Sequence, residues 1–278
     1  MDQILVSVDM EGVGGVTAAK QVRKGTPDYP AARELMIEEA NAAIRGAMDG
    51  GAEHVVVNDS HEDMTNLLVA AIDGRATVIT GYPKSPGDMI AGLTSEFDGV
   101  LFIGYHASAG TQQAVLAHTL SDLTLRAVRV NGEEWGETEI NAARAGYLGV
   151  PVLLVSGDDK VCARARQVLP MTATVEVKRS LGVRSAASLP VVRARELIYE
   201  GARRAVSEAR AESFRPTPPF VVEAELATTA SAEFCEIVPG TTRIGIRSVQ
   251  CKTEDFEVAY QYLIAWLEIG LRGLDGDL

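Results

Sequence analysis

The stretch QILVSVDMEG, residues 3–12, passes directly from an apolar run to two carboxylates, Asp9 and Glu11. Three later apolar runs also end in polar residues: HVVV is followed by residues 58–61, GVLFIG by 105–107 and PVLLVSG by 158–159. Apolar runs of this length are typical of buried strands in a parallel sheet. Ligands of open α/β sheets bind at the carboxyl ends of the strands. We therefore expect the polar residues that follow these strands to meet along one edge of a sheet.

The order of the apolar runs predicts an α/β fold with a doubly wound, mostly parallel sheet in residues 1–170. The predicted strands of this part cover residues 3–9, 54–58, 76–80, 99–104, 127–130 and 151–155. The predicted helices cover residues 31–48, 137–146 and 159–168. We expect this part of the chain to carry the functional site.

After Pro170 the predicted strands no longer end in Asp or His. Strands are predicted at 172–178, 221–226 and 242–249, and helices at 190–211 and 253–271, with a short helix between the last two strands. The proline-rich segment 214–219 is typical of a linker. We expect residues 171–278 to form a smaller α+β lobe that covers the site and contacts other subunits.

Composition argues against several classes of partner. The 278 residues carry a formal net charge of -12, which argues against nucleic acid because binding a polyanion needs a basic face. No apolar stretch reaches the length of a membrane span, and no basic and apolar leader precedes the first strand. The three cysteines are widely spaced, which favours free thiols in a reducing compartment. These features predict a cytoplasmic protein that does not bind membranes.

Asp9 and Glu11 lie two residues apart on an extended segment, so their side chains point to the same side. Two carboxylates this close repel each other unless a cation or a proton lies between them. A metal ion and a solvated loop pair are both compatible with this spacing. Gly12, Gly14 and Gly15 follow without the G-x-G-x-x-G spacing of a phosphate-binding loop, so we interpret them as residues that let the backbone turn sharply.

The chain contains four histidines, and three of them accompany the predicted strand ends. His61 and His106 directly end their strands, and His118 lies twelve residues after His106 in a loop-like stretch. Imidazole and carboxylate are ligands that zinc selects, so a metal site is the leading hypothesis and structural or surface histidines are the alternative. His54 begins a strand at the opposite end of the sheet, and we expect it to have no functional role.

Four glutamates, Glu133, Glu134, Glu137 and Glu139, crowd a predicted turn and the start of a helix. Acidic residues suit helix N-termini because of the helix dipole, so we expect most of them to be solvated. Composition alone leaves open which of the four faces the site.

Six short segments carry a resemblance to a known family. Residues 7–12 have the pattern S-x-D-x-E-G, 58–61 N-D-S-H, 104–107 G-Y-H-A, 117–119 A-H-T and 136–142 G-E-x-x-x-N-A, and residues 155–159 contain G-D-D. In these segments, which come in the order of the family, the chain resembles the D-aminopeptidase (DppA) family of dinuclear zinc metallopeptidases. The resemblance spans most of residues 5–160 and continues more weakly to the C-terminal helix.

The resemblance implies two Zn²⁺ per subunit. The first would have the ligands Asp9, Glu11 and His61. The second would have Asp9 again, as a bridging carboxylate, together with His106 and Glu137. The choice among the four glutamates is thereby implied to be Glu137.

The resemblance also implies that His118 is the catalytic residue beside the metals. Asn58, Asp59 and Asn141 are candidates for the partners that orient the imidazole ligands. The activity implied is that of a zinc-dependent aminopeptidase that removes the N-terminal residue, a D-amino acid, from short peptides through a water activated by two metals. Members of the family form ring-like homo-oligomers, with a decamer in the best-known member.

Two other functions compete with this interpretation. Phosphohydrolases of the haloacid-dehalogenase type also place acids after a first strand and an acidic pair such as Asp158 and Asp159 after a later one, and they use Mg²⁺. They would leave His61, His106 and His118 without a role. A protein that kept the scaffold to bind metal or peptide without catalysis is the other alternative.

Overall fold

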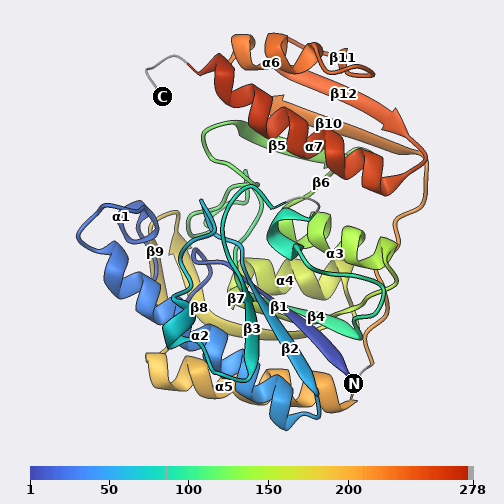
Figure 1. Ribbon diagram of the computed structural model, residues 1–278. Coiled ribbons are helices and arrows are strands. Elements are labelled where there is room, and N and C mark those ends of the chain that lie inside the picture. The colour runs from blue at the N-terminus through green and yellow to red at the C-terminus, as the bar shows by residue number, and fades with distance from the viewer. Residues whose placement is uncertain (85–86, 209, 275–278) are drawn as a thin grey trace.

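The computed structural model describes residues 1–84, 87–208 and 210–274. Residue 209 of the predicted helix 190–211 and the end of the predicted lobe 171–278 lie outside these described residues. Figure 1 shows a larger part built around one sheet and a smaller part, with its own sheet, that contains the C-terminal helix.

The larger part contains a seven-stranded sheet with the order β3-β2-β1-β4-β7-β8-β9. Its strands are β1 Gln3–Val8, β2 His54–Asp59, β3 Ala76–Ile79, β4 Gly99–Tyr105, β7 Val152–Asp158, β8 Ala173–Gly182 and β9 Ser185–Ser188. All neighbours pair in parallel except β8 and β9, which form an antiparallel pair. The predicted fold class, a doubly wound and mostly parallel sheet, is confirmed.

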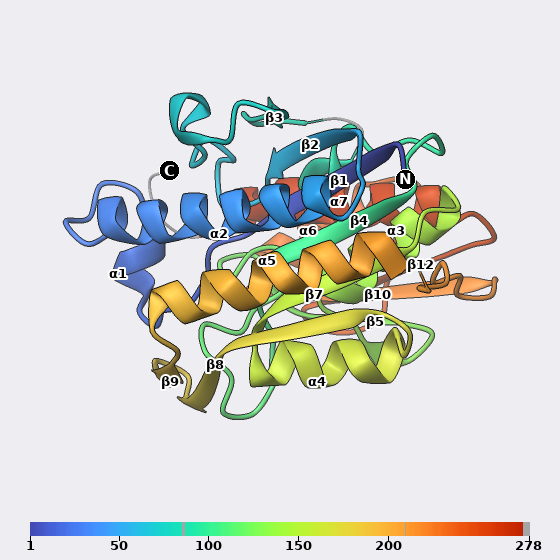
Figure 2. The same ribbon diagram turned by 90° about the horizontal axis from the view of Figure 1, so that it is seen from below.

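Helices cover both faces of this sheet. Ile4, Val6 and Val8 pack with α2 (Tyr29–Asp49) and α5 (Val191–Glu208), which lie side by side in Figure 2. Leu5 of the same strand faces the other way and packs in a cluster with α3 (Glu137–Tyr147) and α4 (Asp159–Val168). Because both faces are buried, the central strands β1, β4 and β7 are buried at nearly every position rather than at alternate positions.

The smaller part contains a five-stranded antiparallel sheet with the order β11-β12-β10-β5-β6. Its strands are β5 Leu125–Val130, β6 Glu133–Glu134, β10 Phe220–Leu226, β11 Thr242–Arg243 and β12 Ser248–Thr253. The helices α6 (Thr229–Glu236) and α7 (Phe256–Gly270) pack on this sheet around the buried Trp266. The remaining short helices are α1 Ala19–Val22 and the 3-10 turns η1 Val69–Ala71, η2 Asp88–Ile90 and η3 Leu271–Gly273.

Two expectations about the sheets are wrong. The strand predicted at 127–130 was placed in the parallel sheet, but β5 pairs antiparallel with β10. A parallel return needs a crossover, and residues 106–124 between β4 and β5 contain no helix to supply one. Conversely, β8 and α5 follow residue 170 and yet extend the large sheet and cover it. The boundary between the two sheets therefore does not lie at residue 170. The division of the chain into two separate domains stays a prediction.

The strand predicted at 242–249 is also interrupted. The chain turns after β11 and returns as β12, so that Thr242 pairs with Gln250. In the described residues, no helix combines the length and apolar character needed to cross a membrane.

The loops after β1 and β4 meet in close backbone contact. The amide of Asp9 donates to the carbonyl of Ile103 at 2.8 Å, and the amide of Gly12 donates to the carbonyl of Gly104 at 2.7 Å. A Cβ atom on Gly12 would lie 1.9 Å from the carbonyl oxygen of Tyr105. Gly104 has a φ of +69°, and a Cβ atom there would lie 2.3 Å from the carbonyl oxygen of Asp9. The approach of the two strand ends therefore requires glycine on both sides.

We predict that Gly12→Ala destabilises the protein, because the added methyl group forces the two loops apart. Overpacking of this kind costs about 1–3 kcal/mol or more in the free energy of unfolding. Gly74→Ala is the matched control, since Gly74 is exposed and a Cβ atom there meets nothing within 4 Å. Urea unfolding followed by circular dichroism measures both variants. Equal stability of the Gly12→Ala and Gly74→Ala proteins would contradict the close contact.

Candidate metal centre

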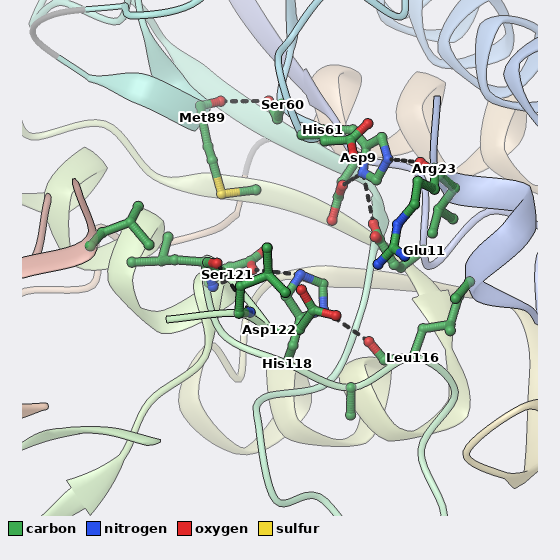
Figure 3. Close-up of a pocket in the computed structure, with 18 of the residues that line it drawn as sticks. Asp9, Glu11, Arg23, Ser60, His61, Met89, Leu116, His118, Ser121 and Asp122 are labelled. Atoms are coloured by element: carbon green, nitrogen blue, oxygen red, sulfur yellow. Dashed lines mark hydrogen bonds and ion pairs between the residues drawn. The ribbon is translucent and has the colours of Figure 1, made fainter. Parts of the chain in front are cut away.

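The carboxyl edge of the large sheet carries two groups of side chains that could hold a metal ion. One group is Asp9, Glu11 and His61, and the other is His106, His118 and Glu137, with the ligand atoms of each group within 4.8 Å of one another. All of these side chains are buried except His118, which is half-buried. Figure 3 shows Asp9, Glu11 and His61 gathered on one side of a cavity that His118 also lines.

Asp9 lies between the two groups. Its Oδ1 is 3.3 Å from Nδ1 of His61, and its Oδ2 is 3.4 Å from Nε2 of His106. Strand order explains this position, because β1 lies between β2 and β4 and the residues that follow all three strands meet. One carboxylate thus presents each of its oxygens to a different imidazole, as a bridging ligand would.

Each imidazole that faces Asp9 also faces a second carboxylate. Nδ1 of His61 lies 3.0 Å from Oε2 of Glu11, and Nε2 of His106 lies 3.2 Å from Oε2 of Glu137. His118 stacks on His106 with ring centroids 4.1 Å apart, and its Nε2 lies 3.8 Å from Oε1 of Glu137. The structure therefore brings together all six residues that the sequence singled out.

Backbone carbonyls fix the orientation of the three imidazoles. Nε2 of His61 donates to the carbonyl of Val22 at 2.7 Å. Nδ1 of His106 donates to the carbonyl of Ala107, and Nδ1 of His118 donates to that of Leu116, both at 2.9 Å. A carbonyl only accepts, so these nitrogens carry the hydrogen, and in the neutral ring the other nitrogen is left with a lone pair. In each ring that lone pair faces a carboxylate, and two acceptors need a cation or a proton between them.

The expected orienting residues have other roles. Asn58 and Asn141 both donate to Met89, to its carbonyl at 2.6 Å and to its sulfur at 3.2 Å. Asp59 accepts from the amide of Leu67 at 2.7 Å. Among the described residues, none of these three side chains hydrogen-bonds to an imidazole ring, and Asp59 instead accepts from the main-chain amide of His61 at 3.3 Å. The imidazole rings are oriented by the main-chain carbonyls of Val22, Ala107 and Leu116, and a sequence gives no sign of such bonds because every residue has a carbonyl.

The electrostatics of the site favour positive charge. Burial, followed by the neighbouring Glu11, raises the pKa of Asp9 to about 8. Burial also opposes the ionised form of Glu11, but the charge of His61 outweighs it and holds the pKa of Glu11 well below its usual value. Burial opposes the charged form of His106 as well, yet Glu137 and Asp9 raise the pKa of His106 to about 10. Glu11 and Glu137 thus stay ionised while protons are drawn onto Asp9 and the histidines, and a metal cation would supply the same positive charge.

Unpartnered atoms support the same conclusion. Among the described residues, Oδ2 of Asp9, Oε2 of Glu11 and Nε2 of His106 are buried without a hydrogen-bond partner. Leaving a buried polar atom unpartnered costs about 1–3 kcal/mol, more for a charged group, so such atoms are rare without a function. Carboxylate oxygen and imidazole nitrogen are the donor set of Zn²⁺. The residues present therefore fit a divalent metal.

One positioning residue was missed from the sequence. Nζ of the buried Lys178, in β8, donates to the carbonyls of Val13 at 3.0 Å and Val16 at 2.6 Å, and also to that of Glu11. Its ammonium group ties the turn that follows β1, which carries Glu11, to β8, which lies three strands away in the sheet. The signal available was a lysine that ends the alternating strand segment VEVK.

The acidic pair Asp158 and Asp159 does not join the site. Oδ1 of Asp158 accepts from the amide of Val161 at 2.8 Å, as the N-cap of α4, and its Oδ2 accepts from the hydroxyl of Ser180 at 3.0 Å. Asp159 accepts from the amide of Ser180 at 2.6 Å. Of the four strand ends expected to meet along one edge, this one contributes to neither group of potential ligands. The acid that the phosphohydrolase alternative needs near Asp9 is thus used in helix capping.

The glutamate cluster and His54 have clear positions. Glu133 and Glu134 are exposed, and Glu139 accepts from the amide of Gly136 at 3.0 Å at the start of α3. Glu137 alone of the four lies against the histidines. His54 begins β2 at the opposite edge of the sheet and is exposed.

The two groups open into a cleft of about 900 Å³. Its walls come from loops of the large sheet and from the end of α7 with η3, through Leu267, Glu268 and Leu271. The hydroxyl of Tyr82 donates to Glu268 and so joins the two walls. A cleft of this size accommodates a small ligand or a short peptide segment.

Comparison with known proteins agrees with this geometry. The sequence model of the D-aminopeptidase family matches residues 2–265. The D-aminopeptidase of Bacillus subtilis (strain 168) is 35% identical over 274 residues, which cover 97% of this chain and 98% of that protein.

The solved structure of the Zn-dependent D-aminopeptidase DppA from Bacillus subtilis, a self-compartmentalizing protease, superposes with a TM-score of 0.93 at 34% identity. The match covers 99% of this chain and 100% of that chain. The resemblance found in the sequence motifs is confirmed over nearly the full length. The chain therefore belongs to the D-aminopeptidase family of peptide hydrolases.

Proposed function

We propose that this protein is a zinc-dependent aminopeptidase that removes the N-terminal D-amino acid from short peptides. The observation that carries the proposal is the position of Asp9, whose two carboxylate oxygens face two buried imidazoles, each beside a further carboxylate. The preference for a D-amino acid is taken from the related D-aminopeptidase.

In this proposal Asp9, Glu11 and His61 hold one Zn²⁺, and Asp9, His106 and Glu137 hold a second. When bound, the two metals would supply an acidified water as nucleophile and polarise the scissile carbonyl. Val22 and Ala107 hold the two imidazole ligands through their carbonyls, and Lys178 holds the turn that carries Glu11. The support is the set of unpartnered buried atoms and the zinc dependence of the relative.

His118 is proposed as the catalytic residue. Its Nδ1 donates to the carbonyl of Leu116, so its Nε2 is the nitrogen that exchanges a proton in the cleft. As a neutral ring it accepts a proton at Nε2 from the attacking water, and as a cation it returns that proton to the leaving amine. Its side chain is 19% exposed, so it is reachable from the cleft, whereas His106 is 1% exposed.

We also propose that the protein assembles into a ring-like homo-oligomer, with a decamer as the expected size. The relative is a self-compartmentalizing protease. Large apolar side chains are exposed on the smaller part, at Phe234, Ile237, Ile244 and Ile246. These residues belong to α6 or lie beside α6 and β11, at the end of the molecule farthest from the large sheet (Figure 1). Burying them between subunits would remove them from water.

The proposed location is the cytoplasm. Cys162, Cys235 and Cys251 are buried free thiols, as is usual in a reducing compartment. The proposed partners are short peptides and other copies of the chain, without nucleic acid or membrane.

We predict that the zinc-loaded protein releases p-nitroaniline from D-alanyl-p-nitroanilide and that His118→Asn loses most of this activity. Loss of a general acid or base typically lowers kcat by about 10²–10⁴. Because this interaction forms mainly in the transition state, kcat falls much more than KM rises. Steady-state kinetics and bound zinc are measured together, and both zinc ions are expected to remain in the variant. His54→Asn is the matched control, since His54 is exposed at the opposite edge.

Four results would contradict this account in different ways. Activity of His118→Asn near the wild-type rate removes His118 from the chemistry. Loss of zinc from the variant makes His118 a ligand instead, as its place in the group with His106 and Glu137 would allow. Zinc without turnover of any peptide by the wild type supports a binding protein, and magnesium-dependent release of phosphate supports a phosphohydrolase.

Assembly gives a separate prediction. Light scattering on the purified protein is expected to give a mass several times the 29.6 kDa of one chain. Ile237→Asp combined with Ile246→Asp is expected to lower that mass, because charged residues would enter an apolar contact. Val69→Asp combined with Val192→Asp, the same kind of change at two exposed apolar residues of the larger part, serves as the control. A monomer at micromolar concentration that still hydrolyses the peptide would show that no ring is needed.

A further inference from the structure

Asp88, the first residue of η2, is a buried carboxylate without a partner among the described residues. It is 7% exposed and lines the cleft of the metal centre. Its side chain makes no hydrogen bond or ion pair with any of the described residues, and its Oδ1 is buried and unsatisfied. Its φ of +45° is in the left-handed region, which few residues other than glycine adopt. An isolated buried carboxylate is costly unless something outside the chain completes it.

The turn that carries Asp88 is fixed against the metal centre. The side-chain amide of Asn58 donates to the carbonyl of Asp88 at 3.3 Å and to that of Met89 at 2.6 Å. The hydroxyl of Ser60, the neighbour of His61, also donates to the carbonyl of Met89, at 2.8 Å. Figure 3 shows this contact and the side chain of Met89 reaching into the cavity. Asp88 is therefore held on a rigid turn beside the end of β2.

The charged groups around Asp88 do not neutralise it. Lys84 directs its ammonium group to the side chain of Asn58 and the backbone of Asp59. Arg144 forms two hydrogen bonds of 3.1 Å with Glu257.

The balance of burial and charge at this position weakens the ionised form of the carboxyl without abolishing it at neutral pH. Burial is the main cause that raises the pKa of Asp88 to about 6. Lys84 and Arg144 oppose the rise, and the carboxylates of Glu137 and Glu268 add to it. A cation that enters the cleft next to Asp88 would stabilise its ionised form.

We propose that Asp88 binds the α-ammonium group of the N-terminal residue of the substrate. The inference rests on the proposed peptidase function and deepens it. The α-ammonium is the positive end of a peptide and is separated from the scissile carbonyl by a single carbon, so its subsite must adjoin the metal centre. Asp88 lines the same cleft as that centre, on a turn held by Asn58 and Ser60, and its Oδ1 has no partner among the described residues. This subsite would restrict hydrolysis to the first peptide bond.

A metal ion is a poorer occupant for this position. Neither group of potential metal ligands found among the described residues includes Asp88. A single carboxylate suits an ammonium group, which donates its own hydrogens and needs no set of several donors.

The test compares two substrates in zinc-loaded protein, D-alanyl-p-nitroanilide and propionyl-p-nitroanilide, which lacks only the amino group. The measured quantity is the ratio of their kcat/KM values. In Asp88→Asn this ratio is expected to fall by about 10- to 100-fold, because a hydrogen bond between charged groups is lost. Competitive inhibition by D-alaninamide is a second measurement, and its inhibition constant is expected to rise by a similar factor. Asparagine tolerates a positive φ, so the variant is expected to fold.

Asp122→Asn is the matched control, because Asp122 is an exposed aspartate that lines the same cleft, and the change removes the same charge. The ratio is expected to stay at the wild-type value in this variant. An equal fall for both substrates in Asp88→Asn, an unchanged ratio, or loss of zinc from that variant would overturn the assignment. If the wild type hydrolyses neither substrate, the proposed function fails first, and this result is distinct from a failure confined to Asp88→Asn.

Discussion

The repulsion among three buried carboxylates is the interaction on which the rest of the structure depends. Asp9, Glu11 and Glu137 are buried together at the edge of the cleft, and each faces the lone pair or proton of an imidazole. Such an arrangement is stable only with positive charge inside it. Two contacts of the surrounding chain hold these carboxylates in place. The backbone contact between Gly12 and Gly104 fixes the end of β1 against the end of β4, and Lys178 holds the turn that carries Glu11.

The strand order of the large sheet positions the charged side chains, and the part of the chain that contains the second sheet contributes to the cleft beside them. Since β1 lies between β2 and β4, the residues that follow these strands converge without any further device. Met89 and Asp88 then line the cleft next to β2, and the end of α7 with η3 of the smaller part lines it as well. The site is thus assembled by segments from both sheets, and a change in the smaller part can alter substrate access without contacting a metal ligand.

The sequence predicted the parts of the fold that follow from local pattern. Buried parallel strands need apolar residues throughout, so β1, β2, β4 and β7 were recognisable. The polar residues that follow β1, β2 and β4 converge, whereas those that follow β7 do not join the site. The position of β5 was missed because sheet membership depends on pairing with β10, about ninety residues later, which leaves no trace in either strand. The roles of Val22, Ala107 and Leu116 were equally invisible, since any residue supplies a carbonyl. Asp88 stands out only because its buried Oδ1 has no hydrogen-bond partner among the described residues, and this can be seen only once its neighbours in space are known.

Crystals of the zinc-loaded protein, measured on both sides of the zinc absorption edge, test the central claim most directly. The account predicts two anomalous peaks per subunit, one beside Glu11 and His61 and the other beside His106 and Glu137. Each peak should lie about 2.0–2.2 Å from one of the two carboxylate oxygens of Asp9. A single peak, or two peaks of which only one touches Asp9, would contradict the bridging role on which the proposed function rests.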